Sequence, residues 1–179
     1  MENRDLSSVI EKFVDGAKRI FRENLESVIL YGSAATGAYV PKVSDINILL
    51  LIKKSDPGQI FAFGKELKGL IRKERFTTQI LTVPEFLGSG DIFPLEYHEL
   101  AGTRKVLFGD DTVKGLSLTK ANLRHQVEGL LRGCIATLRQ ILIASGGDKR
   151  ILMASIVNWS GSLRTVHKGL LRLKGIDPA

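Results

Sequence analysis

The chain has 179 residues, of which 44% are hydrophobic and 25% are charged, which is typical of a folded protein and excludes a disordered one. This length fits one substantial domain, or a compact domain with a smaller appendage. No apolar run reaches the length of a membrane span, and the first residues, MENRDLSSVIEKF, lack the basic and then apolar pattern of a signal peptide. We therefore expect a cytoplasmic protein. The single cysteine, Cys134, excludes an internal disulfide and lies among leucines, which predicts a core residue.

The formal net charge of +7 favours an anionic partner, which can be a nucleotide, a nucleic acid or an acidic protein. The alternative is that the charge serves solubility. The basic residues are spread along the chain without one dense run and without interleaved aromatic residues. Nucleic-acid binding is therefore compatible with the sequence but not indicated by it.

The first predicted elements are a helix and two strands. Residues 5–23 carry apolar side chains at three- and four-residue steps, which predicts a helix capped by Asp5 or Ser7. Residues 28–31 and 46–52 are short apolar runs, β-branched and rich in leucine, and they are predicted strands. Turn-forming residues lie in the segment that joins them: Gly32, Ser33, Gly37 and Pro41.

The two ends of this joining segment have the composition of a metal-nucleotide site. Gly32 has no Cβ, so its backbone can approach a ligand closely, and Ser33 adds a hydroxyl beside backbone N–H groups. Such a turn suits a phosphate. Asp45 and Asn47 lie two residues apart on the predicted strand, so their side chains point to the same face. Their oxygens can share Mg²⁺, with waters and phosphate oxygens of a nucleotide as the other ligands.

The order Gly32-Ser33, a spacer, Ser44-Asp45-Ile46-Asn47 and an apolar run resembles the Gly-Ser…Asp-x-Asp signature of the polymerase β-like nucleotidyltransferases, including the small antibiotic-modifying and minimal types. The segments FPLEYHEL and KVLFG resemble the same bacterial proteins, including members with asparagine in the signature, so the likeness covers most of residues 26–111. An ordinary hairpin is the alternative, but it does not explain why a polar pair interrupts so apolar a strand.

The resemblance implies a chemistry. It is the transfer of a nucleoside monophosphate from ATP or another NTP to an acceptor hydroxyl, with Mg²⁺ neutralising charge on the triphosphate. By resemblance, Gly32, Ser33 and Ser44 bind the nucleotide, and Asp45 and Asn47 hold the metal.

Two of the three carboxylates expected from the resemblance are missing. Asn47 offers a carbonyl oxygen but no negative charge, so we expect a lower metal affinity. The strand predicted at residues 77–83 has Thr78 or Gln79 where the resembled proteins have a third acid. Neither side chain acts as a general base near neutral pH.

A replacement acid is expected in residues 91–100, where Pro94 is taken to begin an extended run. In such a run Glu96 and His98 share one face and Glu99 lies on the other. Glu96 is the first candidate for the missing acid beside Asp45, and the alternative is a glutamate of an edge strand that faces water. His98 is either a proton shuttle or simply solvated.

The other segments predict more helices and one more strand. Residues 60–71 form an apolar helical stripe, and the basic residues near it predict a solvated face. Residues 104–108 predict a short strand, and Asp110 with Asp111 predicts a solvated turn. Two helical stripes follow, from Leu123 to Leu142 and from Leu152 to Leu170, separated by Ser145-Gly146-Gly147.

These elements predict an α+β fold: a small mixed sheet of four or five strands flanked by helices, then a C-terminal helical hairpin. We expect a nucleotidyltransferase-like domain at residues 1–115 and a helical domain at 116–179, shortened relative to related proteins that continue with further helices. The hairpin, which includes Trp159, is expected to form core and a homodimer contact.

Three functions remain open on the sequence alone. The first is a working transferase in which Asn47 is a neutral ligand and Glu96 supplies the missing acid. The second is a catalytically degenerate member that binds a nucleotide or a partner without turnover. The third is an interaction module whose helical hairpin mediates assembly. The acceptor and the preferred base are not indicated by the sequence.

Overall fold

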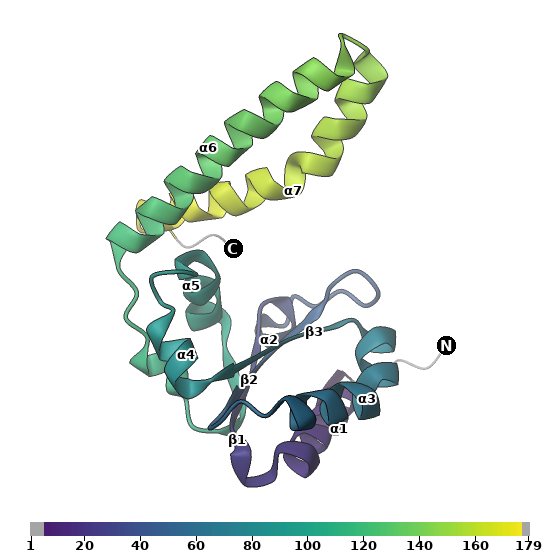
Figure 1. The fold of residues 1–179 in the computed structure, drawn as a ribbon, viewed down its shortest axis with the longest axis vertical. Coiled ribbons are helices and arrows are strands. Elements are labelled where there is room, and N and C mark those ends of the chain that lie inside the picture. Colours follow the sequence, from purple (N-terminus) through teal and green to yellow (C-terminus); the bar gives the residue numbers. More distant parts are fainter. Residues whose placement is uncertain (1–5, 177–179) are drawn as a thin grey trace. The chain divides into compact units, whose positions relative to one another are not determined.

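The apolar runs predicted as strands form one mixed sheet. The computed structural model describes residues 6–176 and contains four strands within them, in the spatial order β3-β2-β1-β4 (Figure 1). They are β1 (Leu25–Tyr31), β2 (Ile46–Ile52), β3 (Phe76–Thr82) and β4 (Lys105–Gly109). β1 is antiparallel to both of its neighbours, whereas β2 and β3 are parallel. The predicted α+β fold is confirmed.

The helices fall into two groups along the chain. Those of the first hundred or so residues lie among the strands: α1 (Leu6–Phe21), η1 (Arg22–Asn24), α2 (Ser33–Thr36), α3 (Pro57–Glu74), α4 (Val83–Gly88), α5 (Pro94–Thr103) and η2 (Thr112–Gly115). Two long helices follow, α6 (Lys120–Ser145) and α7 (Lys149–Leu173). The described chain forms two compact units, one made of the residues up to Gly90 with Glu96–Ser117, the other of Asp91–Leu95 with the residues from Leu118 on.

The main core lies between one face of the sheet and the pair α1 and α3. Phe13 of α1 is fully buried, and its ring stacks on Phe76 with a centroid distance of 4.5 Å and meets the edge of Phe63 at 5.4 Å. Asp56 caps the start of α3 by accepting hydrogen bonds from the backbone N–H groups of Gly58 and Gln59. Asp5, one of the two caps predicted for the first helix, lies outside the described residues.

The expectation of an extended run at residues 91–100 is wrong. Pro94 is the first residue of helix α5, a position where its fixed φ suits the helix and its missing N–H costs nothing. Tyr97 and Leu100, three residues apart, are buried as one helical stripe. As a result Glu96 and Glu99, also three apart, share a helix face instead of lying on opposite faces of a strand.

The sequence predicted a solvated turn at Asp110 and Asp111, but in the structure Asp111 is paired with an arginine. Its carboxylate accepts hydrogen bonds from Nε and Nη2 of Arg104, at 2.9 and 3.0 Å, and the side chains are 21% and 25% exposed. The hydrogen bond from Arg104 holds the pKa of Asp111 below its ordinary value. Asp111 therefore fixes the segment after β4 instead of offering a metal ligand.

The second unit is a helical hairpin, as predicted. Thr119 caps α6, and Asp148 caps α7 by accepting from the N–H groups of Arg150 and Ile151. Cys134 is buried, which confirms it as a core residue, and Trp159 of α7 is half-buried. None of the helices in the described part of the chain is both long and apolar enough to cross a membrane.

Candidate functional site

The pairing of β1 with β2 brings the two halves of the sequence motif to one end of the sheet. The last pair in the register is Tyr31 with Asn47, so Gly32 and Ser33 follow directly where Asp45 leads into β2. The short helix α2 begins at Ser33 and packs against both strands (Figure 1). Gly32, Ser33, Asp45 and Asn47 therefore belong to the same end of the sheet.

Gly32 holds this end together through its backbone. Its φ is +74°, a conformation that other residues rarely adopt, and an added Cβ would lie 3.0 Å from the side-chain nitrogen of Asn47. The N–H of Gly32 donates to Oγ1 of Thr103 at 2.9 Å, and that hydroxyl donates to the carbonyl of Glu99 at 2.8 Å. Gly32 is thus fixed between Asn47 of β2 and the end of α5.

The Thr103 contact changes the role expected of Gly32. Because its N–H is already bonded, and the N–H groups of Ala35 and Thr36 bond to the Gly32 carbonyl, a phosphate at this turn would have to use the Ser33 hydroxyl and the first two amides of α2. Gly32 would instead allow a ligand to approach the backbone closely, because it has no side chain.

Asp45 is paired with a cation that the sequence analysis did not single out. Oδ1 of Asp45 accepts a hydrogen bond from Nε of Arg75 at 2.9 Å and forms an ion pair with its Nη2 at 2.8 Å. The two side chains are 47% and 51% exposed, so this ion pair contributes little to stability. Ser44 shapes the preceding loop, because its hydroxyl accepts from the N–H of Val40 at 3.1 Å.

Two glutamates of α5 lie close to the same end of the sheet. Burial, then the negative charges of Glu99 and Glu96, raises the pKa of the Tyr31 hydroxyl above its ordinary value. Tyr31 directly precedes Gly32, so both carboxylates are near the candidate site. Glu99 is half-buried and Glu96 is exposed.

The third strand shows which side chain faces the site. The parallel register pairs Asn47 with Thr77 and Leu49 with Gln79, so Gln79 shares the face of Asn47. Thr78 pairs with Ile48 and points to the face covered by α1 and α3. Its hydroxyl is buried there and has no hydrogen-bond partner among the described residues. Of the two positions considered for a third acid, only Gln79 faces the site.

The oxygen donors at the site fit a metal ion that arrives on a triphosphate. Asp45 offers a carboxylate and Asn47 an amide oxygen, whereas the described residues contain no group of three His, Cys, Asp or Glu side chains that could hold an ion alone. Mg²⁺ commonly binds through one or two carboxylates with waters and substrate phosphates. Waters and the phosphates of a nucleotide would therefore have to supply the remaining ligands.

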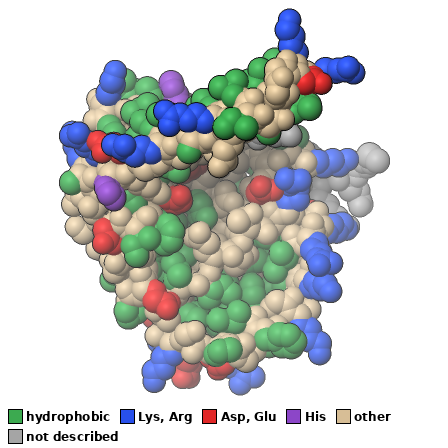
Figure 2. Space-filling view, turned by 45° about the horizontal axis from the view of Figure 1, so that its top comes forward, with side chains coloured by type: hydrophobic (Ala, Val, Ile, Leu, Met, Phe, Trp, Pro, Cys, Tyr) green, Lys and Arg blue, Asp and Glu red, His purple; other side chains and the backbone are tan. Residues whose placement is uncertain are grey.

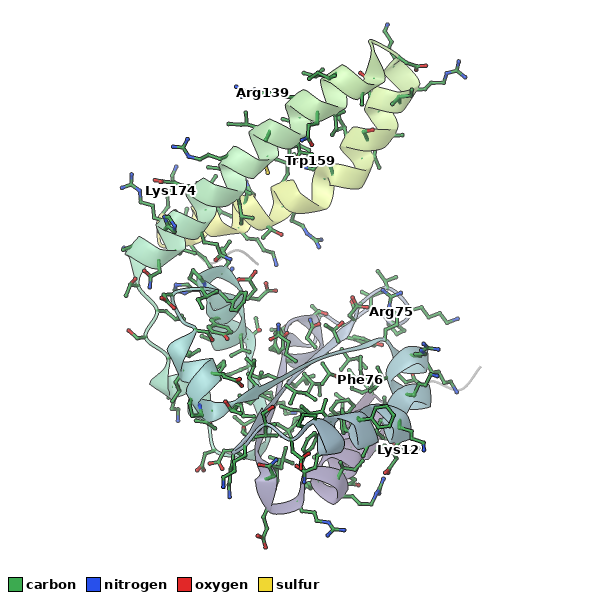
Figure 3. The ribbon with its side chains drawn as sticks, in the orientation of Figure 1. Lys12, Arg75, Phe76, Arg139, Trp159 and Lys174 are labelled. Carbon is green, nitrogen blue, oxygen red and sulfur yellow. The ribbon has the colours of Figure 1, made fainter. Side chains whose placement is uncertain are left out.

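Lysine and arginine residues are spread along the sequence, and among the described residues Arg75 is the one that is paired with Asp45. On the face that Figure 2 shows, lysine and arginine side chains occur at several separate places. This agrees with their even spread along the sequence. The positive charge near Asp45 thus comes from a specific residue, Arg75, which Figure 3 labels near the start of β3.

Comparison with solved structures gives the fold a precedent. The chain is similar to spectinomycin adenyltransferase AAD(9) from Enterococcus faecialis, solved with ATP and spectinomycin, with a TM-score of 0.51 and 14% sequence identity. The match covers 95% of this chain and 100% of that one. The chain has a nucleotidyltransferase-like fold. No protein-family model and no curated protein matches it.

Within this nucleotidyltransferase-like fold, sequence reasoning missed three residues near the motif. Arg75 and Thr103 contact motif residues from distant parts of the chain, which no local pattern indicates. Glu99 was assigned to the wrong face because α5 was taken for a strand. The proline at the start of that segment was the available signal, since proline favours the first position of a helix.

Proposed function

We propose that this protein binds an NTP, with ATP as the first candidate, and transfers its nucleoside monophosphate to an acceptor hydroxyl. The observation that carries the proposal is the pairing of Tyr31 with Asn47, which places the Gly32-Ser33 turn beside the strand that follows Asp45. The fold shared with an adenyltransferase that was solved with ATP supports the same reading. We place this activity in the cytoplasm, where NTPs are available.

Each residue of the site has a proposed role. Ser33 and the first amides of α2 donate hydrogen bonds to phosphate oxygens, and Gly32 lets the triphosphate approach the backbone. Ser44 can donate its proton to a phosphate while its oxygen still accepts from Val40. Asp45 and Asn47 would hold Mg²⁺, which neutralises charge on the triphosphate when bound.

The acceptor needs a base. As its oxygen bonds to the α-phosphorus and pyrophosphate leaves, the hydroxyl must lose a proton. Glu99 is the proposed base, and Glu96, the acid that the sequence put first, lies on the same helix face and is the second candidate. Both carboxylates influence Tyr31, which adjoins the phosphate-binding turn.

Pyrophosphate release tests the proposal. With a mixture of NTPs and Mg²⁺, we expect slow release by the unaltered protein, with water replacing the unknown acceptor. Asp45→Ala removes the only carboxylate of the pair and should lower the rate by about 100-fold or more, because metal-ion stabilisation of the transition state is worth several kcal/mol. Asn47→Asp restores a negative ligand and should raise the rate by about tenfold or more.

The main alternative is a catalytically degenerate protein that binds nucleotide without turnover. It is motivated by the missing negative charge at Asn47 and by Gln79 on β3. The same experiment separates the two readings. NTP binding without pyrophosphate release in the unaltered protein rejects the working transferase, whereas release that Asp45→Ala abolishes rejects the degenerate one.

The helical hairpin supports a homodimer as an additional proposal. Ile135 and Leu142 lie seven residues apart on α6 and are 49% and 59% exposed, and Leu163 and Leu170 have the same spacing on α7 and are 43% and 40% exposed. Residues seven apart share one face of a helix, so each helix carries an exposed apolar pair of the kind that helix-helix contacts bury.

The molar mass in solution tests the dimer. We expect twice the 19.7 kDa of one chain, from light scattering during size-exclusion chromatography. Leu142→Glu should produce a monomer, because it places a charge in the exposed apolar pair of α6. Gln140→Glu, on the opposite side of α6, is the control and should remain dimeric. A monomeric unaltered protein would contradict the dimer but not the nucleotide site.

A further inference from the structure

Arg75 stands at a backbone position that its side chain does not favour. It ends α3 in the left-handed conformation, with φ of 58°, where glycine or asparagine is the usual residue. Its carbonyl oxygen accepts a hydrogen bond from the N–H of Ile46 at 3.0 Å, which fixes the residue beside the start of β2. An unfavourable conformation held in place next to a candidate site suggests that the side chain is used there.

The charges of the neighbouring side chains indicate what Arg75 does at the site. Asp45 carries one negative charge, Asn47 none, and the guanidinium of Arg75 one positive charge. Together the three side chains are neutral without any metal ion. With aspartate in place of Asn47, the same three side chains would carry a net charge of −1 and would repel a triphosphate until a cation bound.

Arg75 can reach a phosphate without leaving the site. A guanidinium has five N–H donors, and the contacts to Asp45 use its Nε and one terminal nitrogen. Its planar donors match phosphate oxygens, which makes arginine a common phosphate ligand. Because the pair with Asp45 is half-exposed, exchanging part of it for a phosphate costs little.

We propose that Arg75 is the resident cation of this site: it contacts the triphosphate of the bound nucleotide and makes nucleotide binding largely independent of a divalent cation. This inference rests on the proposed nucleotide-binding function and adds a phosphate ligand to it. Divalent cations would then be needed for transfer and not for binding.

Isothermal titration calorimetry with ATP, in excess EDTA and in excess Mg²⁺, tests the proposal. The unaltered protein should bind ATP in EDTA with a Kd within about threefold of that in Mg²⁺. Arg75→Gly should weaken binding in EDTA by about tenfold or more, since it removes a charge-assisted contact, and binding should then depend on Mg²⁺. Glycine suits the left-handed position, so the midpoint of thermal unfolding should stay equal or rise. Arg75→Lys keeps the charge and should recover part of the affinity.

Arg72→Gln is the control, since Arg72 lies in the last turn of α3, is exposed and loses the same charge. Its Kd in EDTA should stay within about threefold of the unaltered protein. An Arg75→Gly protein that binds ATP in EDTA as tightly as the unaltered protein would overturn the inference, and so would an unaltered protein that binds only with Mg²⁺. Both results leave nucleotide binding intact. Failure of ATP and the other NTPs to bind under either condition would overturn the proposed function and this inference with it.

Discussion

Gly109→Ala should unfold the protein or lower its free energy of unfolding by about 3 kcal/mol or more, which is among the largest effects of a single methyl group. Gly109 ends β4 with φ of +74°, and an added Cβ would lie 1.9 Å from the carbonyl oxygen of Glu26. The obstacle is backbone of the central strand β1, so it cannot rotate away as a side chain can. Urea denaturation of the purified protein measures the change.

A shift of β4 that relieved this clash would break further contacts. The hydroxyl of Ser27, which is fully buried in β1, bonds with the carbonyls on both sides of Gly109, those of Phe108 at 3.2 Å and Asp110 at 2.9 Å. Gly69→Ala is the matched control: Gly69 lies inside α3 with no atom within 4 Å of an added Cβ, and the change should raise stability by about 0.5–1 kcal/mol. Equal stabilities for the two variants would contradict the geometry at Gly109.

Patterns over a few neighbouring residues correctly predicted the elements that depend only on the local sequence. Residues 46–52 are apolar except for Asn47 and lie between Asp45 and Lys53, and β2 has these limits. Both faces of β2 are covered, which explains why the run does not alternate with polar residues. The segment at 91–100 failed because its polar residues permit either period, and the buried pair Tyr97 and Leu100 becomes informative only once the helix is known.

Part of the candidate site could also be predicted from the local sequence, and part could not. Gly32, Ser33, Asp45 and Asn47 could be predicted to lie at one end of the sheet because a single turn connects them. Arg75 is 30 residues from Asp45 and Thr103 is 71 residues from Gly32, so their contacts depend on the path of α3 and α5. The Thr103 contact fixes the Gly32 backbone, and the Arg75 contact places a positive charge beside Asp45. No local sequence pattern indicates either contact.

Replacing the acid that accepts the proton of the acceptor should lower turnover by about 100- to 10,000-fold, the usual contribution of general base catalysis. We expect Glu99→Gln to show this loss and Glu96→Gln a smaller one. Glu99 raises the pKa of Tyr31 more strongly than Glu96 does, and its carbonyl holds the Thr103 hydroxyl that binds Gly32. Glu99 is therefore the first candidate for the base. Pyrophosphate release in the Asn47→Asp background, where turnover should be fastest, measures both variants.

The two glutamines also separate a base from a residue that merely shapes the site. Glutamine keeps the size and most hydrogen bonds of glutamate but does not take up a proton near neutral pH, so kcat should fall while the Kd for ATP stays within about threefold. Glu99→Asp, which keeps an ionisable group on a shorter side chain, should retain more turnover than Glu99→Gln. If Glu96→Gln shows the greater loss, the base is Glu96, the more exposed acid and the first candidate from the sequence. If both glutamine variants keep full turnover, α5 does not supply the base, and the proton leaves to water or to a group of the acceptor itself.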